Sequence, residues 1–235
     1  MFKHVRGTLL RDDQDTMQPS YDEIFGWLAQ EIEKRNPEGE KPMPVIMDGQ
    51  ESLWAALPKY FPGVNLIEIL DIIHVTSYVW EATHLFYKKG SQKAFGFAKQ
   101  RILRILKGEA DRVIRGLRWM GTHQKLSEKK LESLERICGY FEKNSHRMAY
   151  DEYLAAGYPI ASGVIEGACR NVVVDRIERS GMSWVLDGAN SMLYTRCIYL
   201  SGLWDEFTRF RINKECERLY LGYSANDQSY QQKVA

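Results

Sequence analysis

The sequence predicts an α/β protein in which a small parallel sheet is joined to a long helical region. Two apolar runs, Pro44–Met47 and Leu66–Leu70, are each followed by an aspartate, and a helical pattern over Glu51–Phe61 separates them. Strand, helix and strand of this length, joined by tight turns, are typical of a β-α-β unit with parallel strands. From about Ile73 to Ala156 the apolar residues recur at helical spacing instead, which predicts several consecutive helices.

Further elements are expected on both sides of this unit. Phe2–Leu10 predicts a short strand, and an amphipathic helix is expected over Tyr21–Lys34. Beyond the loop Gly157–Gly163, three more helices are predicted: Val164–Arg179, Asp187–Ser201 and Leu203–Leu221. The chain then divides into a sheet region, a helical insertion, a second helical region and a polar tail, at residues 1–75, 76–157, 158–212 and 213–235.

Composition is that of an ordinary globular protein. Of the 235 residues, 44% are hydrophobic and 27% are charged, and no apolar run approaches the ~20 residues that span a membrane. The first residues contain no apolar signal-peptide stretch, so a cytoplasmic location is expected. The four cysteines form no C-x-x-C pair and no zinc-type cluster, which favours structural thiols in a reducing compartment.

Positive charge is concentrated in one stretch, although the formal net charge of the chain is only +1. Between Lys88 and Arg118 there are ten Lys or Arg residues against Glu109 and Asp111, which gives 10 − 2 = +8 over 31 residues. Charge at this density can neutralise DNA phosphates. The alternative is a solvated helix face without a partner.

Two aspartates follow the predicted parallel strands. Asp48 and Asp71 are expected at the carboxyl edge of the sheet, where ligands bind in open α/β folds. Alternatively, each caps the helix that follows it. His74 lies three residues after Asp71 and is interpreted either as a hydrogen-bonded core histidine or as a group that orients a metal ligand together with Asp71.

A glutamate occupies the apolar first turn of the helix expected at Val164–Arg179. Glu166 either pairs with Arg170 at i,i+4 or serves as a metal-binding carboxylate that faces the sheet edge. Two or three carboxylates at one edge suit hard divalent cations, and a two-metal site activates an attacking oxygen and stabilises a leaving oxygen.

Six motifs together resemble the ISKra-type insertion-sequence transposases of bacteria, over about residues 2–212. They are Met47–Gly49, Leu70–His74, Gly139–Phe141, Met148–Tyr153, Pro159–Cys169 and Asp175–Trp184. The last two are long and specific, whereas the Asp-Gly pair alone is not.

The resemblance implies an RNase H-like core with a large all-helical insertion before the glutamate-bearing helix. It also implies a D…D…E site that binds Mg²⁺ or Mn²⁺, usually two ions, for hydrolysis and strand transfer at transposon ends. Asp48 corresponds to the second aspartate and Glu166 to the glutamate, with Asp71 as the competing second aspartate. Asp71 and His74 resemble the supporting C-x-x-H element of the related Mutator-type transposases, with aspartate in place of cysteine.

One departure from the family concerns the first aspartate, which should lie on an earlier strand. Asp12, Asp13 and Asp15 lie in a loop and are poor substitutes. The chain is therefore expected to be truncated at its N-terminus and inactive alone. The alternatives are an RNase H-like nuclease without transposition and a non-catalytic DNA-binding or assembly remnant.

DNA, as transposon ends and as target, is the expected partner, and the chain is also a candidate for homo-oligomer formation. Binding through phosphates should weaken as the salt concentration rises. The expected backbone contacts are Lys99, Arg101, Arg104, Arg170, Arg176 and Arg179. For Arg176 and Arg179 the alternative is an ion pair with Asp175 or Glu178.

Overall fold

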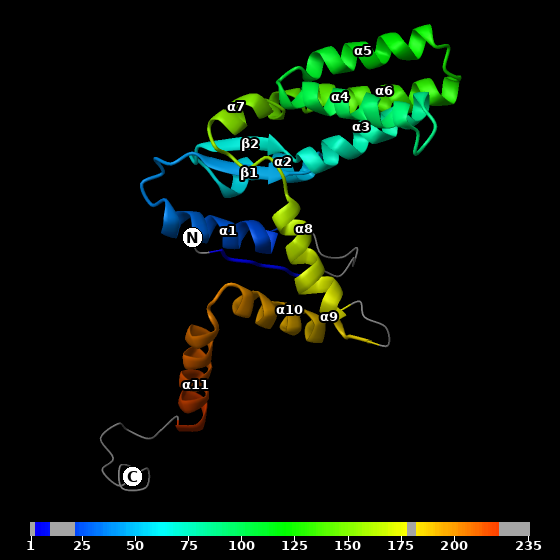
Figure 1. The fold of residues 1–235 in the computed structure, drawn as a ribbon. Coiled ribbons are helices and arrows are strands. Elements are labelled where there is room, and N and C mark those ends of the chain that lie inside the picture. The colour runs from blue at the N-terminus through cyan, green and yellow to red at the C-terminus, as the bar shows by residue number, and fades with distance from the viewer. Residues whose placement is uncertain (1–2, 10–21, 178–181, 221–235) are drawn as a thin grey trace. The chain divides into compact units, whose positions relative to one another are not determined.

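The computed structural model describes residues 3–9, 22–177 and 182–220, without the side chains of Glu166 and Arg176. Two compact units make up the chain: residues 18–167 form one, and residues 1–17 with 168–235 form the other. Most described residues are helical, and they contain one small parallel sheet (Figure 1). None of the helices in these ranges combines the length and the apolar character that crossing a bilayer requires.

The sheet of the 18–167 unit consists of β1 (Met43–Met47) and β2 (Leu66–Leu70), joined by α2 (Glu51–Tyr60). The strands are parallel, in a register that pairs Met43 with Leu66 and Met47 with Leu70. This confirms the predicted strand, helix and strand. The helix α1 (Asp22–Arg35) packs on α2, and the ring of Phe25 meets that of Phe61, the residue after α2, edge to face at 5.8 Å.

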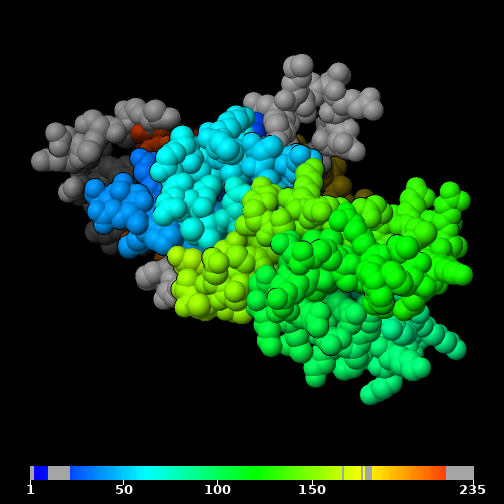
Figure 2. Space-filling model, turned by 90° about the horizontal axis from the view of Figure 1, so that it is seen from above, coloured from blue at the N-terminus to red at the C-terminus, as the bar shows by residue number. Residues whose placement is uncertain are grey.

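The predicted run of helices after the sheet is confirmed as five helices and a short 3₁₀ turn. They are α3 (Ile72–Phe86), α4 (Gln92–Leu106), α5 (Ala110–His123), α6 (Glu128–Lys143), η1 (Ser145–Arg147) and α7 (Tyr150–Ala155). In Figure 2 the green residues of α4 to α6 form one continuous packed mass. The start of α4 is fixed by the Ser91 hydroxyl, which caps the helix by accepting a hydrogen bond from the Ala94 amide.

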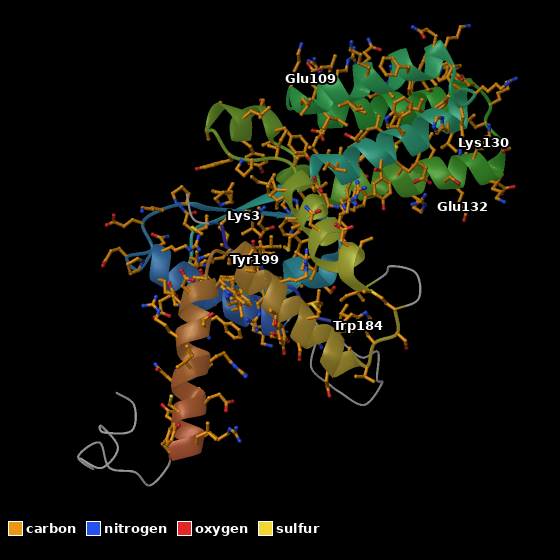
Figure 3. The ribbon with its side chains drawn as sticks, turned by 60° about the horizontal axis from the view of Figure 1, so that its bottom comes forward. Lys3, Glu109, Lys130, Glu132, Trp184 and Tyr199 are labelled. Atoms are coloured by element: carbon orange, nitrogen blue, oxygen red, sulfur yellow. The ribbon has the colours of Figure 1, made fainter. Side chains whose placement is uncertain are left out.

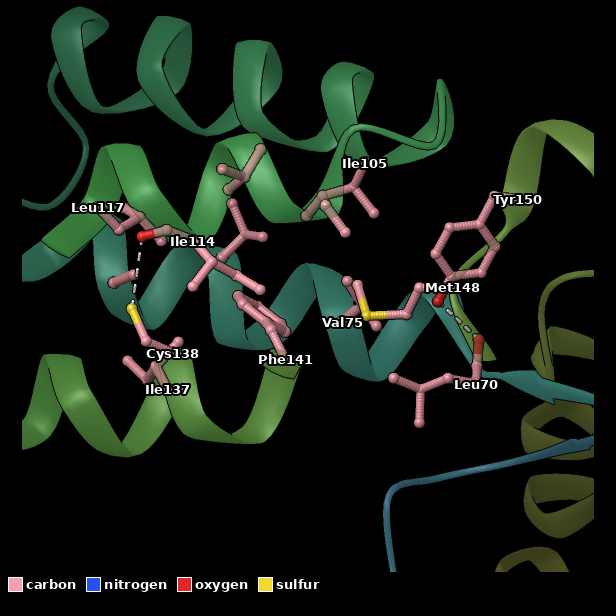
Figure 4. Packing of buried hydrophobic residues seen from close by; sticks show 14 of the residues in the cluster. Leu70, Val75, Ile105, Ile114, Leu117, Ile137, Cys138, Phe141, Met148 and Tyr150 are labelled. Carbon is pink, nitrogen blue, oxygen red and sulfur yellow. Dashed lines mark hydrogen bonds between the residues drawn. The ribbon is translucent and has the colours of Figure 1, made fainter. Parts of the chain in front are cut away.

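One hydrophobic core runs from the end of β2 through these helices (Figure 4). Phe141 and Ile137 of α6 are fully buried against Ile114 and Leu117 of α5. At the sheet end, the hydroxyl of buried Tyr150 donates a 2.7 Å hydrogen bond to the carbonyl of Leu70. The helical region is therefore fixed directly to the last residue of β2.

The other unit is built on α10 (Leu186–Leu200) and α11 (Trp204–Tyr220), and here the strand predicted at Phe2–Leu10 is wrong for residues 3–9. Backbone amides of this segment donate hydrogen bonds to side chains instead of to a neighbouring strand. The Leu9 amide donates to Asn190 Oδ1 at 2.7 Å, and the Val5 amide donates to Ser201 Oγ at 3.0 Å. At Val5 and Leu9, side chains therefore take the place of a neighbouring strand.

The helix predicted at Val164–Arg179 is interrupted. It consists of α8 (Gly163–Cys169), a π-helical turn (Arg170–Val174) and α9 (Asp175–Ile177). Val172 of the π turn is buried in a cluster with Leu193 and Cys197 of α10. A π turn widens the helix by one residue per turn, so the residues on either side are out of phase with a continuous α-helix.

Candidate functional site

The candidate site lies at the carboxyl edge of the two-stranded sheet. Since β1 and β2 end in register at Met47 and Leu70, Asp48 and Asp71 follow them at the same edge. The Asp71 amide continues the pairing by donating to the carbonyl of Met47 at 2.9 Å. The two aspartates nevertheless have different surroundings.

Asp71 is buried, with 1% of its surface exposed, and both of its carboxylate oxygens accept hydrogen bonds. Oδ1 accepts from the Ile73 amide at 3.0 Å and from the Ser162 amide at 3.2 Å, and Oδ2 accepts from the Ser162 hydroxyl. The same loop is also held by the Ile72 amide, which donates to the carbonyl of Ile160 at 3.0 Å. Asp71 therefore caps α3 and fixes the loop from which α8 begins.

Asp48 is only half-buried and has one carboxylate oxygen to spare. Its Oδ1 accepts from the Gln50 amide at 2.9 Å, and its backbone carbonyl accepts from the indole N–H of Trp54 at 2.7 Å. Within the described part of the chain, no hydrogen bond reaches Oδ2. Asp48 is thus oriented by its neighbours while it retains a free acceptor.

Tyr140 of α6 reaches this edge from the helical region, although no role for it was predicted from the sequence. Its ring stacks on Tyr78 at 4.0 Å, and its buried hydroxyl has no hydrogen-bond partner within residues 3–9, 22–177 and 182–220. Burial, and then the proximity of Tyr78 and Asp48, raise the pKa of Tyr140 to about 12. The Gly49 amide opposes this shift without meeting hydrogen-bond geometry. The motif Gly139–Phe141 was the one signal that pointed to this residue.

Gly49 is required by the close approach of Tyr140. A β-carbon at position 49 would lie 2.6 Å from the Tyr140 hydroxyl oxygen and 2.7 Å from Cζ. We expect Gly49→Ala to lower the free energy of unfolding by about 1–3 kcal/mol, since the ring must move out of a packed position. Urea denaturation measures this effect.

The matched control for that substitution is Gly116→Ala, in the middle of α5. A β-carbon there meets no atom within 4 Å. Alanine is the better helix former, so this variant should gain about 0.4–1 kcal/mol. Equal effects of the two substitutions would contradict the close packing of Tyr140 on Gly49.

The described side chains of the remaining candidates form no metal site. His74 is exposed, so its interpretation as a core histidine is wrong; Val75 and Val79 are the residues of α3 that face the core. The backbone of Glu166 lies in α8, four residues after Ser162, and its side chain is outside the described residues. Among the side chains that are described, no three carboxylates, thiols or histidines form a metal site.

The basic stretch Lys88–Arg118 is only partly available to a ligand. Lys99 and Arg104 are exposed on α4, whereas the guanidinium of Arg101 lies 3.5 Å from the centre of the Phe97 ring. Burial, together with the nearby Arg104, lowers the pKa of Arg101. Arg118 of α5 pairs with Glu135 and Glu142 of α6.

Of the arginines predicted to contact DNA outside this stretch, one has a described side chain. Arg170 is exposed in the π turn. The Arg176 side chain and the whole of Arg179 lie outside the described residues.

The site has no counterpart in the comparisons with known proteins. No protein-family model, no curated protein and no solved structure matches the chain significantly.

Proposed function

We propose that this chain is the catalytic portion of a metal-dependent DNA transposase built on an RNase H-like core. The observation that carries the proposal is the free carboxylate oxygen of Asp48 at the carboxyl edge of a parallel sheet. The resemblance of the motifs around Asp48, Asp71 and Glu166 to ISKra-type transposases supports the same reading. In this proposal residues 76–157, which include most of α3 and the helices α4 to α7, are the insertion before the glutamate-bearing helix.

The donors at this edge suit a hard divalent cation in their chemistry. Mg²⁺ and Mn²⁺ prefer carboxylate oxygens, and Asp48 offers one that no protein donor occupies in the described part of the chain. Both oxygens of Asp71 are already engaged, which favours Asp48 as the second catalytic aspartate and gives Asp71 a positioning role. Bound ions would activate the attacking oxygen and stabilise the leaving oxygen of the phosphodiester.

The residues of the chain keep these groups in place. The Gln50 amide and the Trp54 indole orient Asp48, while Asp71 holds Ser162 at the start of α8 and so sets where Glu166 begins its turn. Glu166 is the second proposed ligand. His74, being exposed, is free to act at the rim of the site.

DNA is the proposed substrate, and phosphate contacts are assigned to exposed cations. Lys99 and Arg104 of α4 and Arg170 of the π turn are the described candidates. Arg101 contributes mainly through packing, since its guanidinium is held on Phe97. The DNA contacts of Arg176 and Arg179 remain predictions from the sequence.

Metal binding tests the proposal at Asp48. Titration of Mn²⁺ followed by electron paramagnetic resonance should detect weak binding, because one free carboxylate is a sparse ligand set, and Asp48→Asn should weaken it at least about tenfold. The control Asp111→Asn removes an exposed carboxylate of α5 and should change nothing. Equal Mn²⁺ affinity in Asp48→Asn and the unaltered chain would contradict the proposal. It would favour a non-catalytic DNA-binding protein instead.

A strand-transfer assay with Mn²⁺ and transposon-end DNA addresses the reaction. The isolated chain is expected to give no joined products, because Asp48 and Glu166 are its only proposed ligands. Joined products would overturn the expected inactivity. Hydrolysis without joining would instead identify the RNase H-like nuclease.

A further inference from the structure

A cavity of about 300 Å³ opens beside Gly49, the residue that follows Asp48. Three of its lining side chains are basic, Lys143, His146 and Arg147 from the end of α6 and η1, and one is acidic, Glu51 of α2. All of these residues belong to the 18–167 unit. No role was predicted from the sequence for these four charged residues.

Arg147 is held in this cavity as a rigid, planar donor. Its guanidinium lies 4.2 Å from the centre of the Trp54 ring, Nε donates to Glu68 at 2.6 Å, and Nη1 donates to Asn144 at 3.2 Å. Its side chain is 15% exposed. Nη2 has no acceptor among the residues that the structure describes, so part of the guanidinium fork is left for a ligand. A stacked and braced guanidinium suits phosphate oxygens.

Lys143 supplies a second cation whose present partner is easily replaced. It pairs with Glu51, and the two side chains are 58% and 72% exposed. The hydrogen bond from Lys143, with its charge, lowers the pKa of Glu51. An ion pair this exposed contributes little to stability, so a phosphate can take the place of the Glu51 carboxylate.

The cavity is coupled to the candidate catalytic edge through single side chains. Trp54, which carries Arg147 on its face, donates its indole N–H to the Asp48 carbonyl. Asn144, which braces Arg147, donates to the Tyr140 carbonyl at 2.9 Å. Arg147 is therefore connected to Asp48 through Trp54 and to Tyr140 through Asn144.

We propose that this cavity binds a phosphate group of the DNA backbone next to the one that reacts at Asp48. The inference rests on the proposed function and adds Arg147 and Lys143, with His146 at the exposed rim, as the residues that position the strand. Glu51 acts as an internal competitor that occupies Lys143 when DNA is absent.

The test uses two charge-removing variants with opposite expected effects. In fluorescence anisotropy with labelled duplex DNA over a range of NaCl concentrations, Lys143→Gln should weaken binding by up to about fivefold. It should also lower the salt slope by about one. Glu51→Gln should tighten binding by a similar factor, since it frees Lys143. Both side chains are exposed, so neither change should affect folding.

The matched controls lie on α6 at the end away from the cavity, where Figure 3 shows Glu132. Lys129→Gln and Glu132→Gln make the same changes in charge at exposed positions. At 1.5 Å per residue, Lys129 is about 21 Å along the helix from Lys143. If the Lys143 and Glu51 variants behave like these controls, the proposed phosphate site is wrong.

Two further measurements separate this inference from its alternatives. Lys143→Gln should leave Mn²⁺ binding unchanged, so a failed phosphate site and a failed metal site give different results. Inorganic phosphate should compete only weakly with DNA. If Lys143→Gln alters inorganic phosphate binding but not duplex binding, the cavity serves the free anion and the DNA assignment is overturned.

Discussion

Asp71→Ala is expected to lower the free energy of unfolding by about 2–4 kcal/mol. The substitution removes the cap of α3, typically worth about 1 kcal/mol. It also removes the partner of the amide and the hydroxyl of Ser162, and because Ser162 is only half-buried, the two donors together cost no more than about 1–3 kcal/mol. Because Asp71 fixes the start of both α3 and α8, loss of its carboxylate should loosen both.

Urea denaturation monitored by circular dichroism measures this effect, with Asp71→Asn as the control. Asparagine keeps one side-chain oxygen for the Ile73 and Ser162 amides, so its cost should be clearly smaller. Mn²⁺ affinity should stay closer to the unaltered value in Asp71→Asn than in Asp48→Asn. A loss below about 0.5 kcal/mol in Asp71→Ala would contradict the structural role of this carboxylate.

The second large effect is a loss of stability at alkaline pH. Burial raises the pKa of the Cys138 thiol to about 11, and it also raises the pKa of Tyr140 to about 12 and that of Tyr150 further. As the pH rises, the unfolded chain therefore releases these protons at a lower pH than the folded chain does. Their contribution to stability is complete below the pKa of the unfolded thiol, about 8.5, and is lost progressively through pH 11 to 12.

The midpoint of urea denaturation, measured from pH 7 to pH 11, should fall steeply above about pH 9. Tyr140→Phe and Cys138→Ala should each make that fall less steep, because each removes one of the linked protons. Tyr199→Phe alters a tyrosine that is 68% exposed and should keep the original dependence. A pH dependence unchanged by both Tyr140→Phe and Cys138→Ala would show that these buried groups do not control alkaline stability.

The sheet could be predicted from the sequence because its signals are local. Each apolar run ends at an aspartate, and the helical pattern between them supplies the crossover that parallel strands need. The segment 3–9 could not be predicted, because its amides bond to Asn190 and Ser201, which are 181 and 196 residues away. An apolar, extended pattern is the same whether the partner is a strand or a set of side chains.

The location of Asp48 and Asp71 followed from the parallel strands, but their different roles did not. Asp71 is saturated by Ser162, which is 91 residues away, and no local pattern predicts such a bond. The positions of Tyr140 and Arg147 could not be predicted either, because they reach the site from α6 and η1, which are distant in the sequence. His74 was misplaced because the buried face of α3 passes through Val75, one residue further on.

The discontinuous unit has a consequence for synthesis. Residues 18–167 form a continuous unit, whereas the other unit joins the first 17 residues to the part that begins at Ala168. At about 5–20 residues per second, a ribosome needs about 10–40 s to pass from Leu9 to its partner Asn190. During that interval the nascent N-terminal segment lacks its native contacts and is exposed to chaperones and proteases, while the middle of the chain is already free to fold.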